Sequence, residues 1–381
     1  MESQVKFHGR GGEFFGIWIV NILLSIITLG IYSAWAKVRT KKYLHGNTEI
    51  AGERFEYLAT PIQILIGRIV AFVCVVIWVV SSQFFPVFSG GLVMLFLLVM
   101  PWLIRNNIRF DTRMTRYRNV RFDFTGSLKG AYWAFLGRGL IIFLLFSGLV
   151  FTPFWLGDAA DLISVVLFVA AVVVGFFGYA WTMAGMVRFV LNNIAYGKQT
   201  FSAIIETRFY IKTFLLAALV AFLILAIAAV IGFFTVGSDI MAMIASGNEG
   251  QEPGTGFIAS VIALYLAAFL GFMVVSAFIT VRTWNYIFAQ ATVGSDPEIT
   301  FRSSMEVGSY LWLVVSNFFI QLFTLGLARP WVIVRTSRYL ADITVVVGDV
   351  EALAVKDHEG DAKSSIADEL AQAFDVNIGL G

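Results

Sequence analysis

Thr28 to Leu44 reads TLGIYSAWAKVRTKKYL, and the pattern returns at Thr324 to Leu340 as TLGLARPWVIVRTSRYL. Nine of the 17 aligned positions are identical, at a constant offset of 296 residues. An asparagine precedes both stretches at that offset. A match of this length at a fixed interval indicates an internal duplication, which we place at residues 7–44 and 301–340. The repeat motif consists of Gly30, Trp35, Arg39 and Tyr43 in the first copy and Gly326, Trp331, Arg335 and Tyr339 in the second.

Composition decides the class of protein. Hydrophobic residues make up 59% of the 381 residues, charged residues make up 14%, and the mean hydropathy is +0.82. These values lie outside the range of soluble domains and predict a polytopic α-helical membrane protein. The single cysteine, Cys74, lies in an apolar run, so no disulfide framework is expected within the chain.

Six apolar runs are long enough to cross a bilayer, whose hydrocarbon core of about 30 Å needs about 20 helical residues. They cover residues 62–84, 87–104, 131–156, 160–187, 211–236 and 256–281. The runs form three hairpins, with turns at 86–90, 157–161 and 237–256. These turns contain no Lys or Arg. The positive-inside rule therefore predicts that the basic segments and the C-terminal tail lie in the cytoplasm.

The duplicated segments leave two topologies open. In the first, each copy enters and leaves the membrane on the same face and bends at the Thr-Leu-Gly break, which keeps every basic cluster on one side. About 27 residues per copy suffice for two half-depth arms but not for two spans. We then expect both copies to pack inside a six-helix bundle, because irregular backbone at membrane depth needs protein around it. In the second topology both copies cross, and the chain has eight spans.

Short strands are predicted between the membrane hairpins. Apolar and charged residues alternate at 52–57 and 119–124, which is typical of β-strands, and residues 343–347 are also strand-like. The unit is thus a membrane hairpin followed by a cytoplasmic β-hairpin, repeated about five times in an integral membrane domain at residues 1–347. Residues 5–8 are expected to supply the strand that the last unit lacks, and the strands to pair into a sheet or ring under the membrane.

Residues 348–381 form a separate cytoplasmic tail. Eight of them are Asp or Glu, and residues 357–365 are polar and typical of a linker. Ser365 followed by Asp368 has the spacing of a capping box, which predicts a helix with Ile366, Leu370 and Phe374 on one face.

Ionisable and amide residues inside the apolar runs are the first candidate site. The set is Arg68, Arg138, Lys212, Asn21 and Asn317. A charge within the membrane costs several kcal/mol and is therefore a functional hypothesis. The basic residues either extend to lipid headgroups or form a positive ring around an anion or lipid-headgroup path. The asparagines either bond helix to helix or line a wet pathway.

A second candidate is the basic segment between the second and third runs, whose arginines could bind anionic lipid headgroups or simply fix the topology. They are Arg105, Arg109, Arg113, Arg116, Arg118 and Arg121. No nucleic-acid-binding motif accompanies them. The three histidines are widely separated, so neither a metal site, a catalytic constellation nor a cofactor site is expected, and we predict that the protein is not an enzyme.

Several of these features match a known family. The GIWIVN start at Gly16, the TLGIY break, WAKVR at Trp35 and GNT at Gly46 resemble the YjgN family of bacterial inner-membrane proteins. The resemblance covers about residues 7–347, and it implies a location in the bacterial inner membrane without implying an activity.

Interrupted membrane segments in twin copies often mark the binding site of a transporter. The sequence therefore favours a protein that transports or binds a small solute, an ion or a lipid. The alternative is a structural or adaptor protein whose basic cytoplasmic strands bind anionic lipid or a protein partner. Membrane lipids are the expected partners in both cases, and the sequence does not indicate an oligomeric state.

Overall fold

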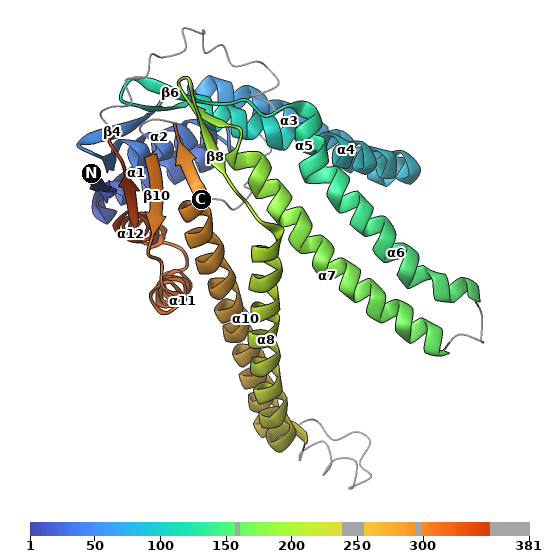
Figure 1. The fold of residues 1–381 in the computed structure, drawn as a ribbon. Coiled ribbons are helices and arrows are strands. Elements are labelled where there is room, and N and C mark those ends of the chain that lie inside the picture. Colours follow the sequence, from blue (N-terminus) through green and yellow to red (C-terminus); the bar gives the residue numbers. More distant parts are fainter. Residues whose placement is uncertain (157–160, 238–254, 295–298, 351–381) are drawn as a thin grey trace.

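The computed structural model describes residues 1–156, 161–237, 255–294 and 299–350, which form a β-sheet with helical hairpins leaving it (Figure 1). The helices are α1 (Gly11–Ile27), α2 (Ser33–Gly46), α3 (Pro61–Phe84), α4 (Pro86–Arg113), α5 (Leu128–Tyr132), η1 (Trp133–Gly137), α6 (Arg138–Leu156), α7 (Asp161–Leu191), α8 (Thr207–Gly232), η3 (Phe233–Gly237), α10 (Thr255–Gln290), α11 (Val307–Phe323) and α12 (Arg329–Asp342). The strands are β1 (Glu2–Gln4), β2 (Lys6–Phe7), β3 (Thr48–Ile50), β4 (Glu53–Tyr57), β5 (Thr115–Tyr117), β6 (Val120–Phe124), β7 (Ile194–Tyr196), β8 (Gln199–Ala203), β9 (Ala291–Val293), β10 (Ile299–Ser303) and β11 (Thr344–Val347).

These strands join one antiparallel sheet in the order β1-β11-β10-β9-β8-β7-β6-β5-β4-β3-β2. Each β-hairpin pairs with the next one along the chain. The N-terminal segment pairs on both sides, because β1 pairs with β11 and β2 pairs with β3. Between them, the backbone N–H of Val5 donates to the carbonyl of Thr344 at 3.1 Å. The first seven residues therefore close the sheet into a ring, and no edge strand is left unpaired in the described part of the chain.

Apolar side chains fill the inside of the ring. A phenylalanine occupies the third position of each longer strand and lies opposite an apolar residue of the next strand in the ring. The pairs are Phe55 with Tyr117, Phe122 with Tyr196, Phe201 with Val293 and Phe301 with Val346. These residues belong to one hydrophobic cluster that also includes Val5 and Phe7. Alternation along the strands puts the charged residues on the outside. The ring is thus a packed core.

The two duplicated segments fold into short helical hairpins, α1/α2 and α11/α12, with the same bend. Leu29 and Gly30 have φ of 49° and 91°, and Leu325 and Gly326 have φ of 50° and 82°. The Thr28 hydroxyl donates to the carbonyl of Leu24 at 2.7 Å and accepts the N–H of Tyr32 at 2.9 Å. Thr324 makes the two equivalent bonds. The polar backbone of each bend is thereby satisfied within the hairpin.

Each short hairpin starts and ends at the sheet. The first arm has 17 residues in both copies, and the returning arm has 14. An arm of 17 residues is about 25 Å long, which is less than the hydrocarbon core of about 30 Å. This is the connection that the re-entrant topology requires.

Six longer helices are apolar enough to span a membrane: Pro61–Phe84, Pro86–Arg113, Leu128–Pro153, Leu162–Leu191, Thr207–Gly232 and Ile258–Gln290. Together with the predicted runs, they make this an integral membrane protein. One predicted turn was wrong, because α4 already begins at Pro86 and the break lies at Phe85. Proline favours the first position of a helix, where its missing N–H costs nothing. The predicted turns at 157–161 and 237–256 and the tail helix fall largely or wholly outside the described residues.

The expected six-helix bundle around the duplicated copies is absent from the described structure. The hairpins α3/α4, α6/α7 and α8/α10 diverge from the sheet, while α1 packs against α12 at the side of the ring (Figure 1). Only 6% to 17% of the apolar windows of the long helices are buried in the protein. In a bilayer, lipid solvates such helices as well as another helix does, so apolar surface alone does not drive them together.

The shared bend makes a testable prediction about glycine. Substituting Gly30→Ala or Gly326→Ala should lower the free energy of unfolding by about 1 kcal/mol, because a side chain at positive φ is strained even where no atom stands in its way. Thermal unfolding of the purified protein in detergent measures the effect. Gly16→Ala, within α1 and also in open space, is the matched control and should leave stability unchanged or raise it. Equal effects at all three positions would contradict the assigned bend.

Candidate functional site

A cavity of about 840 Å³ lies where the sheet meets the helices. Phe55, Phe122, Phe201 and Phe301 of the ring line it on one side, and residues of α4, α7, α8 and α10 line it on the other. The ring centroids of neighbouring phenylalanines are 5.9 to 6.5 Å apart. The core of the ring thus forms an aromatic floor for the cavity.

Most polar groups in the walls are already satisfied. The hydroxyl of Thr112 donates to the Ile108 carbonyl at 2.9 Å, and that of Thr283 donates to the Ile279 carbonyl at 2.7 Å. Thr115 likewise donates to the carbonyl of Asp111 at 2.9 Å. Because these hydroxyls already donate to backbone carbonyls, the walls of the cavity offer a ligand fewer free donors than the residue names suggest.

Two buried donors in the cavity lining have no hydrogen-bond partner among the described residues. They are the Tyr210 hydroxyl and the Trp284 indole N–H. Tyr210 is among the most deeply buried side chains of the protein. An unpaired buried donor costs about 1 to 3 kcal/mol. A ligand acceptor that reached either group through a small side-chain rotation would recover this energy.

Among the residues that line the cavity, Asp111 carries a charge. Lys41, which does not line the cavity, balances that charge. Lys41 donates to Oδ1 of Asp111 at 2.6 Å, and the Lys41 ammonium lies 5.2 Å from the ring centre of Tyr57. His45 also packs against Tyr57, with 5.3 Å between the ring centres. Burial lowers the pKa of His45, which favours a neutral imidazole. The cavity therefore carries little net charge and suits a neutral or weakly polar molecule.

Tyr179 and Phe214 lie at the end of the cavity away from the sheet. Tyr179 of α7 lines the cavity, is 56% exposed, and packs against Phe214 of α8 at 5.1 Å between ring centres. Tyr179 lies 12 residues before Leu191, or about 18 Å along the helix from its end at the sheet. This end of the cavity is level with the apolar parts of the hairpins.

Arg68, Arg138 and Lys212 do not come together in a ring. Arg68 and Arg138 bond within their own surroundings, Arg68 to the hydroxyl of Ser33 at the first bend and Arg138 to the carbonyl of Trp181. Lys212 is exposed on α8. The three residues belong to three diverging hairpins, and none of them lines the cavity.

Arg138 is held between α6 and α7. Its guanidinium donates to the Trp181 carbonyl at 3.1 Å and lies 4.9 Å from the Trp181 ring and 6.0 Å from that of Trp133. A methyl group at Gly185 would overlap this guanidinium. Gly185 therefore makes the space that Arg138 occupies, and the arginine joins the two helices.

The two asparagines differ in their surroundings. Asn317 donates to the Thr336 hydroxyl and accepts from Arg335, both at 3.1 Å. Asn21 is 4% exposed, and neither polar atom of its side chain has a partner among the described residues. At this position the first copy therefore lacks the helix-to-helix bonds that Asn317 makes in the second copy.

The motif residues Arg39 and Arg335 have a counterpart on the returning helix of a third hairpin, Arg282. Arg39, Arg282 and Arg335 each lie 11 residues before Ile50, Val293 or Val346, which hold equivalent places in the ring. Each bonds within its own hairpin, Arg39 to Tyr32, Arg282 to Thr213 and Arg335 to Ser316 and Asn317. In the α6/α7 hairpin Gly185 takes this place, also 11 residues before Tyr196, and Arg138 enters from the other helix. The constant 11-residue spacing was the available signal.

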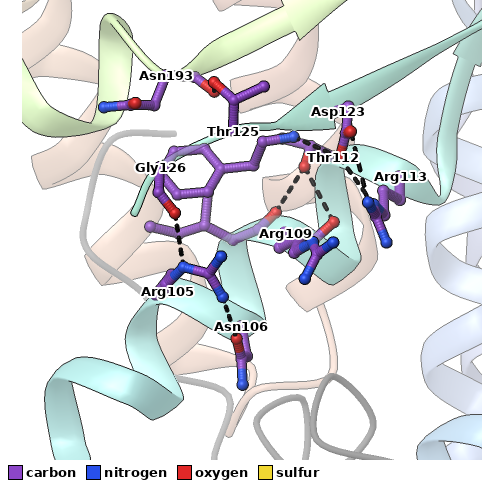
Figure 2. Close-up of polar contacts among 11 residues, drawn as sticks. Arg105, Asn106, Arg109, Thr112, Arg113, Asp123, Thr125, Gly126 and Asn193 are labelled. Atoms are coloured by element: carbon purple, nitrogen blue, oxygen red, sulfur yellow. Dashed lines mark hydrogen bonds and ion pairs between the residues drawn. The ribbon is translucent and has the colours of Figure 1, made fainter. Parts of the chain in front are cut away.

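The basic segment divides between the end of α4 and the strands. Arg105, Arg109 and Arg113 follow one another at four-residue intervals on α4 (Figure 2). Arg105 donates to the Gly126 carbonyl at 2.6 Å, and Arg113 donates to Asp123 at 2.7 Å. Burial raises the pKa of Asp123, but the bonds from Arg113 and from the Phe124 N–H outweigh it and leave the pKa below its usual value. The Nε of Arg109 is buried without a partner.

Arg116 on β5 donates to Glu56 at 3.0 Å. Arg118, in the turn between β5 and β6, donates to the carbonyls of Ala51 and Val350. Four of the six predicted headgroup ligands, Arg105, Arg113, Arg116 and Arg118, are thus engaged within the protein. In the described residues no group of three His, Cys, Asp or Glu could hold a metal ion.

Comparison with known proteins gives one family. The model of a family described as "Bacterial protein of unknown function (DUF898)" matches residues 2–373. Inner membrane protein YjgN of Salmonella typhimurium is 28% identical over 382 residues, covering 94% of this chain and 92% of the relative. Inner membrane protein YjgN of Escherichia coli K12 is 27% identical over 366 residues, covering 93% and 90%. No solved structure matches.

The Arg138 contact generates a prediction. Gly185→Ala should displace the guanidinium from Trp181 and lower the melting temperature of the purified protein. In the double variant Arg138→Ala/Gly185→Ala the two losses should not add, because the clash is gone. Gly148→Ala on α6, where a methyl group meets nothing, is the control and should be neutral or stabilising. Additive losses in the double variant would show that Gly185 does not serve Arg138.

Proposed function

Since the chain belongs to the DUF898 family, we propose that it is a bacterial inner-membrane protein that binds, and delivers to or from the bilayer, a lipid or another small lipophilic molecule. The cavity beneath the ring is the observation that supports this proposal. Its volume of about 840 Å³ falls within the usual range for small-molecule sites. Its aromatic floor, satisfied threonines and balanced carboxylate suit an apolar body with few polar atoms.

The exposed position of Tyr179, at the end of the cavity away from the sheet, supports access from the bilayer. A lipophilic molecule could enter sideways between the diverging hairpins without crossing water. The packed interior of the ring argues against a continuous path for ions to the other side. We therefore favour binding and exchange with the membrane over conduction.

The proposed orientation has the ring in the cytoplasm. The helix ends at the ring carry the basic residues, and the described far ends of the long hairpins do not. In this orientation the two short hairpins re-enter the membrane from the cytoplasmic side, and their exposed tips at Leu29 and Leu325 lie in the bilayer.

A second candidate function is binding of anionic lipid headgroups at the end of α4. Arg109 supports it, because its Nε is buried without an acceptor and no ion pair is formed by its side chain in the described residues. A phosphate oxygen is the natural partner of such a group. This would make the protein an adaptor at the membrane surface.

Filling the cavity tests the first proposal. Met183→Trp on α7 should weaken the binding of a co-purifying molecule about tenfold, equivalent to about 1.4 kcal/mol, because the indole takes up ligand space. The occupancy should fall accordingly. Native mass spectrometry of the gently solubilised protein measures occupancy. Val173→Trp, on the same helix but 48% exposed toward lipid, is the control and should leave it unchanged.

Unchanged occupancy in Met183→Trp would reject the cavity as the binding site. If the retained molecule were an anionic lipid that disappeared in Arg105→Ala/Arg109→Ala instead, the headgroup site would be supported.

Orientation has its own test. After Cys74→Ser, a cysteine introduced at Ser364 in the tail should resist a membrane-impermeant maleimide in intact spheroplasts and react after lysis. Leu95→Cys is the control for a position in the lipid, since Leu95 is 56% exposed on α4. This cysteine should stay unreactive in both intact and lysed spheroplasts. Labelling of the tail in intact cells would overturn the proposed orientation.

A further inference from the structure

A pair of like charges faces outward on the ring. Arg116 of β5 and Arg121 of β6 lie directly opposite each other. Their neighbours Tyr117 and Phe122 belong to the core inside the ring, so both arginines point out. Like charges directly opposite each other destabilise a strand pair, and this arrangement therefore favours binding of an anion.

The protein balances only one of the two arginines. Glu56, opposite Arg116 on β4, accepts from it at 3.0 Å. Arg121 has Gly197 on its other side, whose backbone N–H donates to the Arg121 carbonyl at 3.2 Å and which has no side chain to offer. Among the described residues no ion pair with Arg121 is formed. Lys198, exposed in the adjacent turn, adds a third charge to this basic strip, defined as Arg116, Arg121 and Lys198.

The strip lies toward the end of the ring away from the helices. Arg121 is the second residue of β6, next to the β5–β6 turn, whereas the strand ends that adjoin the helices are Thr115 and Phe124. A headgroup in the membrane would therefore meet the end of α4 before it met this strip. An acidic segment in the aqueous phase is the better match.

Such a segment begins beside the strip. Val350 packs into the core of the ring, and its carbonyl accepts from Arg118 at 3.3 Å, in the turn that joins β5 to β6. Residues 351–381 follow, with seven Asp or Glu and two Lys. We propose that this acidic tail docks on the basic strip and supplies the carboxylates that Arg121 lacks.

Cross-linking tests the proposal in the full chain. In a Cys74→Ser background, Ser364→Cys in the tail and Thr200→Cys on the exposed face of β8 should be joined by a short bis-maleimide. The yield, read by mass spectrometry, should fall about threefold or more in about 1 M salt, which screens exposed ion pairs. Arg121→Glu should give the same fall at low salt, and Lys198→Glu a fall in the same direction.

Controls separate docking from misfolding. Arg208→Glu, an exposed charge at the start of α8, should leave the yield unchanged. Reversing the tail with Glu359→Lys/Asp361→Lys should restore cross-linking in the Arg121→Glu protein. A yield indifferent to salt and to Arg121→Glu would overturn the proposal. So would a cross-link that forms between chains when the two single-cysteine proteins are mixed.

Discussion

Closure of the ring by the first seven residues is the constraint on which the rest of the structure depends. An open sheet has two edge strands with unpaired backbone groups, and one N-terminal segment that pairs with both edge strands removes these edges. Here β1 binds the last strand and β2 binds β3. The fifth repeat is therefore split between the chain ends, with α11, α12 and β11 from one end and β1 and β2 from the other. Arg338 adds a bond from α12 to the Gly9 carbonyl at 3.1 Å across this seam.

The ring also explains why a cavity exists. Long apolar helices gain little from packing on one another in lipid, so their positions are set where their ends join the strands. Hairpins anchored around a ring diverge from it (Figure 1). The cavity is left between the ring phenylalanines and the helices α4, α7, α8 and α10. A compact bundle would have filled that space with side chains. A binding site beneath the ring and the absence of a bundle thus have the same cause.

Local patterns in the sequence predicted the elements better than their assembly. The six spans follow from hydropathy, and the strands at 53–57 and 120–124 follow from alternation. The strand at 344–347 follows from its β-branched residues. The cavity could not be found this way, because its walls come from residues as distant as Phe55 and Phe301, and their meeting depends on ring closure. The sequence singled out Arg138 because of its position within an apolar run. The space for its guanidinium is provided by Gly185, 47 residues further along the chain. Depth alone does not say which neighbour makes room for a charge.

The duplicated hairpins show how one motif gained two sets of bonds. In the second copy Arg335 reaches Ser316 and Asn317. In the first copy Val20 replaces the serine and offers no acceptor, while Tyr32 replaces Ala328 and takes the bond of Arg39. Arg39 is thereby turned away, and Asn21 stays buried without partners at a cost of about 1 to 3 kcal/mol. The identical bend fixes the shape of both hairpins, but the bonds between their arms differ.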